Sequence, residues 1–397
     1  MAGVATGAGF DLYETSARGN AMGGAVVGLT GDASCIYNNP ANMVDLPGVQ
    51  TVAGVTLAQP TTTQNLGPAG RYAVDPQIFP LPYVYATWQA SDRWWLGMAE
   101  FTRFGLGTSY NPSWPGQYNS TEANIKSFSL NPSVACKITD QLSAAAGFEA
   151  MYMDVMLARS LPPPIGPNVP LTLTGGAWGF GGDFALDWKP AADLGVGLVY
   201  RLPVRQQIRG DASTPGNPNP FLGTPAQNGD FASTLVLPAS TTLGVNYLPT
   251  SRLNLGAAAT YTQWHSFDEL AMSFSGLTVG GAPLSSANSV LNWHDTWRFG
   301  LGAEYWLMQD WALQSSYVYE MDPVSLAHAD YLLPPGDRHS IGLGTRVRVD
   351  AWTFDISYIL MFLTSESFAA RPAEGILATK SENGLAHLIG ISAGRKF

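Results

Sequence analysis

The sequence carries little charge and contains no long hydrophobic run. Only 13% of its 397 residues are charged, about half the share of an ordinary soluble domain. No run of roughly eighteen apolar residues occurs, which excludes a membrane-spanning helix. The formal charge is −10 and Lys and Arg form no cluster, so a nucleic-acid-binding surface is excluded as well.

Cysteine is almost absent. Cys35 and Cys136 lie far apart, without Cys or His at metal-ligand spacing, so we treat them as incidental and expect no metal site and no cofactor. The start "MAGVATGAGF" lacks the basic residues and apolar core of a secretory signal. We therefore take the chain as a mature form behind an added Met.

Glycine and aromatic residues are abundant instead, with 43 Gly, 12 Trp, 16 Tyr and 17 Phe. Together with the low charge, this leaves two possibilities: a loop-rich secreted β protein, or a protein whose surface does not face water. Length alone does not separate several soluble domains from one large barrel.

Alternation with a period of two residues continues along most of the chain after Val49. In "HSIGLGTRVRV" the apolar side chains alternate with Ser, Gly and Arg, and "WRFGLGAEYWL" and "WTFDISYILMF" follow the same pattern. A β-sandwich also alternates, but its strands are commonly about five or six residues long. Runs of ten or more residues match tilted strands that cross a bilayer.

Short turns alternate with long connections along the chain. Six short turns and seven long polar connections predict an all-β, membrane-spanning antiparallel barrel of about fourteen strands over residues 47–397. Aromatic residues beside the short turns predict a girdle at the membrane interface; they are Trp94, Trp95, Trp188, Tyr247, Trp306, Trp311 and Trp352.

The last strand, "HLIGISAGRKF", ends in Phe397 and resembles the signal read by the bacterial barrel-assembly machinery, although Arg395 departs from it. It also contains "GISAG", which matches the GxSxG pattern of hydrolases. That chemistry requires a strand-to-helix elbow. No helix follows Ser392, so we predict that the protein is not an enzyme.

Residues 7–43, from "GAGFDLYETS" to "IYNNPANM", resemble the N-terminal plug of the FadL/TodX family of outer-membrane transporters for long-chain fatty acids and hydrocarbons. Ala8-Gly9-Phe10, Asp32-Ala33-Ser34 and Asn39-Pro40-Ala41 carry this resemblance. Later segments match in order, among them "FGLGTSY", "TQWHSFDEL", "YEMDPV" and "LPPGDRHSIGLG", while Arg103 stands where the family commonly has Pro.

The resemblance implies a barrel in the bacterial outer membrane, closed inside by a hatch formed by residues 1–46. It implies passive uptake of hydrophobic molecules, in the first place long-chain fatty acids. A dry pocket captures such a ligand because burial contributes about 25 cal/mol per Å² of apolar area. The expected partners are this ligand, outer-membrane lipid and lipopolysaccharide, and the assembly machinery; we expect a monomer.

The resemblance also implies roles for individual residues. Phe10 is expected to touch the ligand. In the family a kink in the third strand opens the wall beside the Asn39-Pro40-Ala41 turn. Here the kink is expected near Gly105 and Gly107, because residues without side chains permit a bend.

Glu320, which alternation places on the inward face, and Arg338, at the outer end of the next strand, are candidates for binding a polar head group. The alternative is that they belong to a bracing network in the lumen with Arg298, Glu304, Arg346 and Asp355. Three other functions stay open: uptake of aromatic or alkane hydrocarbons, a general diffusion porin, and a structural or adhesive barrel acting through loops such as "GDASTPGNPNPF".

Overall fold

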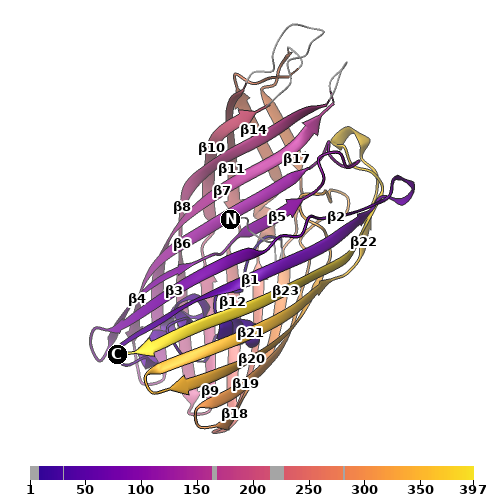
Figure 1. Cartoon of the computed structure of the whole chain (residues 1–397). Coiled ribbons are helices and arrows are strands. Elements are labelled where there is room, and N and C mark those ends of the chain that lie inside the picture. Colours follow the sequence, from indigo (N-terminus) through magenta and orange to yellow (C-terminus); the bar gives the residue numbers. More distant parts are fainter. Residues whose placement is uncertain (1–8, 30, 163–167, 215–227, 280–281) are drawn as a thin grey trace.

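A single closed sheet dominates the structure, a computed structural model that describes residues 9–29, 31–162, 168–214, 228–279 and 282–397. Antiparallel pairing runs from strand to strand, and β23 (Thr379–Lys396) returns to pair with β1 (Val49–Asn65). The wall is therefore a barrel of fourteen strands, which confirms the predicted fold class (Figure 1).

Within the described residues, nine wall strands are continuous. The other five, which are the third and the seventh to tenth in chain order, consist of two pieces each. The strands are β1, β3 (Phe79–Gln89), β4 and β5 (Trp94–Phe101, Gly105–Ser109), β6 (Glu122–Lys137), β7 (Leu142–Leu161), β8 (Val169–Ala191), β9 and β10 (Leu194–Arg201, Val204–Ser213), β12 and β11 (Ser240–Thr250, Gly229–Leu237), β13 and β14 (Leu253–Thr262, Glu269–Ser275), β18 and β17 (Thr296–Met308, Ser286–Val290), β19 (Trp311–Glu320), β20 (Arg338–Val349), β21 (Trp352–Leu363) and β23.

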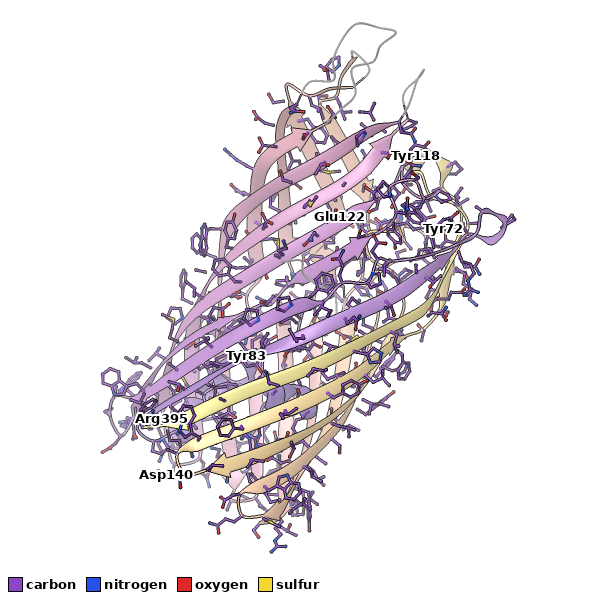
Figure 2. The ribbon with its side chains drawn as sticks, in the orientation of Figure 1. Tyr72, Tyr83, Tyr118, Glu122, Asp140 and Arg395 are labelled. Atoms are coloured by element: carbon purple, nitrogen blue, oxygen red, sulfur yellow. The ribbon has the colours of Figure 1, made fainter. Side chains whose placement is uncertain are left out.

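The connections hold the remaining short elements of the described residues. They are η2 (Gly67–Ala69), β2 (Arg71–Ala73), η3 (Trp264–Ser266), β15 (Thr278–Val279), β16 (Ala282–Pro283), β22 (Glu366–Phe368) and η4 (Pro372–Glu374). The six expected short turns lie at one rim and the seven longer connections at the other. Figure 2 shows Asp140 and Arg395 at the short-turn rim, and Tyr72 and Tyr118 at the opposite end.

Side chains alternate between the two faces of the wall as the sequence predicted. On β20, Ile341 and Leu343 are exposed outward, while Arg338 and Arg346 are buried inside. The interface girdle differs at Trp306, which shares the inward face of its strand with the buried Glu304, and at Trp95. Trp95 is only 3% exposed and donates from Nε1 to the Leu46 carbonyl oxygen at 2.8 Å. Trp94 and Trp95 are neighbours on one strand, so the period of two places only one of them outside.

Residues 9–29 and 31–46, here called the N-terminal segment, lie inside the barrel and form α1 (Ala17–Ala21), α2 (Cys35–Asn38) and η1 (Pro40–Asp45) (Figure 1). Ser16 begins α1 by accepting a hydrogen bond from Gly19 N at 3.0 Å. Asn39 caps η1 in the same way, accepting from Ala41 N at 3.0 Å. No helix of the described chain is long and apolar enough to cross a membrane.

Inward-facing glycines form the seat for residues 20–28 of this segment. A Cβ added at Gly302 would lie 2.5 Å from the Met22 carbonyl oxygen, and one at Gly256 would lie 2.1 Å from that of Ala25. Similar backbone approaches occur at Gly195, Gly197, Gly300 and Gly342. The segment therefore rests directly on the wall backbone, and any side chain at these positions would displace it.

We predict that Gly302→Val displaces the N-terminal segment, because the new side chain collides with backbone rather than with a flexible side chain. Overpacking of this kind costs about 1–3 kcal/mol. Single-channel conductance in planar bilayers should rise above that of the unmodified protein. The matched control is Ala303→Val, on the outer face of the same strand. Equal conductance for the two variants would contradict the proposed seat.

Candidate ligand pocket and wall interruption

The third wall strand is broken at residues 102–104, between β4 and β5. β3 pairs with β4 only from Tyr83 to Gln89, and β5 pairs with β6 on its other side. No described ladder joins residues 79–82 of β3 to β5. The break directly precedes Gly105, one of the two glycines near which the kink was expected.

Two prolines occupy the part of β3 that has no partner in β5. Pro80 and Pro82 pair in register with Leu57 and Val55 of β1 on one side. Proline has no N–H, and in sheets it is confined to edges and bulges. A β3 edge rich in proline therefore leaves few donors without partners and does not favour pairing with β5.

The N-terminal segment supplies backbone partners at the break. Leu12 N donates to the Arg103 carbonyl oxygen at 2.7 Å, and Gly105 N donates to the Phe10 carbonyl oxygen at 2.9 Å. Asp11 and Phe104 form an antiparallel bridge between these two bonds. Residues 10–12 thus satisfy, from inside the barrel, backbone groups that a continuous third strand would have paired within the wall.

Arg103 holds the break toward the lumen. Its guanidinium donates to Glu149 Oε2 at 2.9 Å and to the Pro238 carbonyl oxygen at 3.2 Å, and it lies 4.9 Å from the centre of the Phe104 ring. Both members of the ion pair are almost fully buried. Removing one partner of such a pair leaves a buried charge, so this contact is a strong constraint on the backbone at residue 103.

Phe10 is 1% exposed and lies in an aromatic cluster. Its ring centre is 5.7 Å from that of Phe104, 5.1 Å from Trp264, 5.3 Å from Phe267 and 5.9 Å from Trp293. The four partner residues lie in the segments that interrupt the third, ninth and tenth strands. Ala8 lies outside the described residues.

A cavity of about 50 Å³ borders β5 on the inside of the wall. Its lining is mainly apolar and comes from β1, β5, β20, β21, β23 and the connections before β3 and before β20; it includes Pro60, Val74, Leu106, Gly107, Leu333, Arg338, Met361, Leu363 and Leu385. A site for one water needs roughly 10–15 Å³. The cavity as it stands therefore has room for a head group or a short chain, and a long chain must displace neighbours.

Arg338 is the one charged residue in this lining. It is 3% exposed, and its Nη2 donates to the Gly9 carbonyl oxygen at 3.0 Å. Neither Nε nor Nη1 has a hydrogen-bond partner among the described residues. A buried donor without a partner costs free energy, so this cavity is suited to an anionic or hydrogen-bond-accepting ligand.

Glu320 lies beside Arg338 in the sheet but lines a different cavity. The register places it between Arg298 of β18 and Arg338 of β20. The cavity that it lines also contains Tyr13 and Asn20 of the N-terminal segment. The structure thus brings Glu320 and Arg338 together in the wall without giving them the same pocket.

The Asn39-Pro40-Ala41 triplet anchors the N-terminal segment to the wall. Asn39 Nδ2 donates to the carbonyl oxygens of Val27 at 2.8 Å and Leu186 at 3.0 Å, and Ser143 Oγ donates to the Ala41 carbonyl oxygen at 3.0 Å. The described contacts of the triplet do not include Gly105 or Gly107. Because η1 packs on β4, β6, β7 and β8, the triplet lies at the β4 side of the break.

Ion pairs connect the same segment to inward residues of the wall. Arg18 binds Glu304 through two hydrogen bonds of 3.0 and 2.8 Å. Arg346 binds Asp355 through bonds of 2.6 and 3.0 Å and also contacts Asp32. Three of the four residues named for a lumen network are thus in ion pairs, and Arg18 and Asp32 are partners that alternation in the strands alone did not reveal.

Two carboxyl groups in the connection between β19 and β20 have a pKa above the ordinary value for aspartate. Burial raises the pKa of Asp322 to about 6, against an opposing effect of the nearby Arg338 guanidinium. Burial likewise raises the pKa of Asp330 to about 6. Asp322 accepts hydrogen bonds from Gly336 N at 2.6 Å and Val324 N at 3.2 Å, which fold this connection over the cavity beside Leu333.

Sequence reasoning missed Pro80, Pro82 and the tryptophans of the aromatic cluster. The prolines were a signal in the sequence, because two prolines so close together in one strand favour a position at a sheet edge. Trp264 and Trp293 lie in segments that matched the family, but their convergence on Phe10 depends on how the strands close.

Two further features of the described residues concern metal ligands and the GxSxG motif. No three His, Cys, Asp or Glu side chains gather there as candidate metal ligands. The "GISAG" motif lies within β23, and Ser392 Oγ donates to Asp355 Oδ2 at 3.3 Å.

Comparison with known proteins gives a consistent result. The family described as outer membrane protein transport protein (OMPP1/FadL/TodX) matches residues 1–397. The long-chain fatty acid transport protein of Escherichia coli O6:H1 is 26% identical over 381 residues, covering 85% of this chain and 82% of the relative. Outer membrane protein P1 of Haemophilus influenzae is 23% identical over 395 residues, with 86% and 83% covered.

Solved structures share the fold. A Pseudomonas aeruginosa FadL homologue superposes with a TM-score of 0.84 at 20% identity, covering 98% of this chain and all of that one. The Pseudomonas putida toluene transporter TodX gives 0.72 at 16% identity, with 98% and 99% covered. With a barrel wall, an interrupted third strand and a family match over its whole length, the chain belongs to the OMPP1/FadL/TodX family of outer-membrane transport proteins.

Proposed function

We propose that the protein takes up long-chain fatty acids by passive transport, without catalysis. The observation that carries this proposal is Arg338, a buried guanidinium with two partnerless N–H groups in an otherwise apolar cavity. A carboxylate satisfies both donors through charge-assisted hydrogen bonds, while the acyl chain takes the apolar side of the cavity. A neutral hydrocarbon leaves those donors unpaired.

The acyl chain leaves the cavity sideways in this proposal. Leu106 and Gly107 of β5 line the cavity, and β5 has no described ladder to β3. An acyl chain that extends between these strands enters membrane hydrocarbon without crossing water, which is the favourable direction for an apolar solute. Gly105 and Gly107 keep this edge of the wall free of side chains.

Residues 1–46 act as a hatch that closes the lumen, and Phe10 lines the ligand route. Because Arg338 also binds the Gly9 carbonyl oxygen, a carboxylate that competes for this guanidinium loosens the Phe10 end of the hatch. The Asn39-Pro40-Ala41 turn holds the other end. Glu320 positions Arg338 from the neighbouring strand. Lipopolysaccharide and the barrel-assembly machinery are the proposed partners outside and during assembly, and the protein acts as a monomer.

Uptake of aromatic hydrocarbons is the second candidate. The cluster of Phe10, Phe104, Trp264 and Trp293 favours it, because a planar ring can exchange with the Phe10 side chain among four aromatic partners. This route makes no use of Arg338. The two functions therefore differ in whether affinity depends on a carboxylate.

We predict that Arg338→Gln weakens palmitate binding by roughly 10- to 100-fold, because a hydrogen bond to a charged group contributes about 1.5–3 kcal/mol. Binding of hexadecanol, which has the same chain without the charge, should change much less. Isothermal titration with both ligands measures this, with Arg298→Gln as a luminal arginine control outside the cavity. Equal losses for both ligands, or none, would make Arg338 a bracing residue and favour the hydrocarbon function.

The double variant Pro80→Val, Pro82→Val should reduce uptake in cells while leaving ligand affinity nearly unchanged. Valine restores two N–H donors to β3 and favours regular pairing, which closes the space beside β5. Uptake of labelled palmitate by cells measures this, with Pro132→Val on β6 as the control. Wild-type uptake by the double variant would sink the lateral route.

Phe10→Ala should weaken palmitate or toluene capture by about 1–3 kcal/mol if the ring lines the route. The melting temperature of the barrel should stay close to that of the wild type, because Phe10 is outside the wall. Phe368→Ala, another buried phenylalanine in the outer connections, serves as the control. A large drop in melting temperature with intact affinity would instead make Phe10 a structural anchor.

A further inference from the structure

The outer face of the wall carries a groove that the proposed transport does not use. It crosses β12, β13, β18, β19 and β20 and has a volume of about 650 Å³. Its lining includes Leu255, Ala257, Leu301, Ala303, Ser315 and Leu343. The groove therefore lies on the side that faces membrane hydrocarbon, away from the lumen.

Two cross-strand rows explain the shape. In one row Leu255, Ala303, Ser315 and Leu343 lie in register across four strands. The small side chains Ala303 and Ser315 form the floor, and Ala257 widens it in the neighbouring row, beside Leu301. Larger exposed side chains such as Tyr247, Leu301 and Tyr317 stand at its sides.

The dimensions match one lipid chain. Five adjacent strands are separated by four spacings of about 4.8 Å, which gives a groove of roughly 19 Å. The hydrocarbon core is about 30 Å thick, so one leaflet accounts for about half of that. Barrel strands are tilted by roughly 35–45°, so the rows run obliquely along the outer face of the wall. A lipid chain that extends from one interface toward the membrane centre can follow this direction.

The lining of the groove is uncharged, and the turns next to it carry exposed charged residues. Tyr247 and Leu255 lie next to the turn at Arg252, in the rim of short turns that faces the periplasm. Arg252 is exposed, and none of the ion pairs of the described residues includes it. Asp193 of the neighbouring turn is also exposed, and its carbonyl oxygen accepts from Leu248 N at 2.8 Å. A cation and an anion at one corner complement a head group that carries a phosphate and an ammonium.

We propose that this groove is a binding site for one phospholipid of the periplasmic leaflet, of the phosphatidylethanolamine type. One acyl chain lies over Ala257, Ala303 and Ser315, and the head group meets Arg252 and Asp193. The same strands carry the N-terminal segment on their inner face, at Gly256 and Gly302, where the wall has no inward side chain. The lipid thus covers the outer side of a part of the wall whose inner side consists of glycine backbone at these two positions.

The test compares lipid retention by two tryptophan variants. Ala303→Trp fills the floor of the groove, whereas Ala86→Trp places the same side chain on the outer face of β3, outside the groove. Each protein is purified in mild detergent, stripped of loose lipid and incubated with phosphatidylethanolamine, and bound lipid is counted by native mass spectrometry. Unchanged electrophoretic mobility without heating confirms that each barrel is folded.

The wild type and Ala86→Trp should each retain one phosphatidylethanolamine, and Ala303→Trp should retain at least tenfold less. Arg252→Gln should weaken retention as well, through loss of the phosphate contact. Equal retention by Ala303→Trp and the wild type would overturn the proposal. It would also be overturned if lipid A were the species retained, or if the wild type were a dimer that Ala303→Trp dissociates, because a second copy would then occupy the groove. Palmitate affinity is measured in parallel, so failure of this site is distinguishable from failure of the transport function.

Discussion

Backbone hydrogen bonding is the constraint on which the rest of this structure depends. In hydrocarbon an unpaired N–H or C=O costs several kcal/mol, so a wall of strands must close on itself, and β23 does so by pairing with β1. The third strand is the place where this rule is strained. Pro80 and Pro82 remove donors from the facing edge of β3, and residues 10–12 provide partners for the broken third strand at Arg103 and Gly105. The break is thus compatible with the membrane because the N-terminal segment completes it from inside.

This arrangement connects the segment to the candidate pocket. Phe10 pairs with the broken strand through its backbone and packs into the aromatic cluster through its ring. Gly9, one residue earlier, accepts a hydrogen bond from Arg338. A ligand at Arg338 therefore acts on the chain that closes the wall. The ion pairs of Arg18 and Arg346 hold the remainder of the segment, because separating buried charges is costly.

The fold was predictable from sequence to a greater extent than the site. Alternation places each side chain on one of two faces, so the outward Ile341 and the inward Asp355 followed from their positions in the strands. The same rule shows why the girdle prediction was wrong at Trp95, which cannot share a face with Trp94. Within the site, the sequence indicated the break because Gly105 is a glycine inside a strand pattern. The contribution of Pro80 could not be predicted, because it depends on β3 being the neighbour of β5 in the barrel.

By itself the sequence determined the strand period, the two kinds of connection and the membership of a transporter family, since these are local patterns that survive without knowledge of contacts. Only the tertiary structure decided which side chains meet: that Arg338 faces an apolar cavity with two unpaired donors, that Phe10 joins residues from three broken strands, and that glycines of distant strands form one seat. Closure of the barrel brings together positions hundreds of residues apart, such as Gly9 and Arg338, and no local pattern encodes that register.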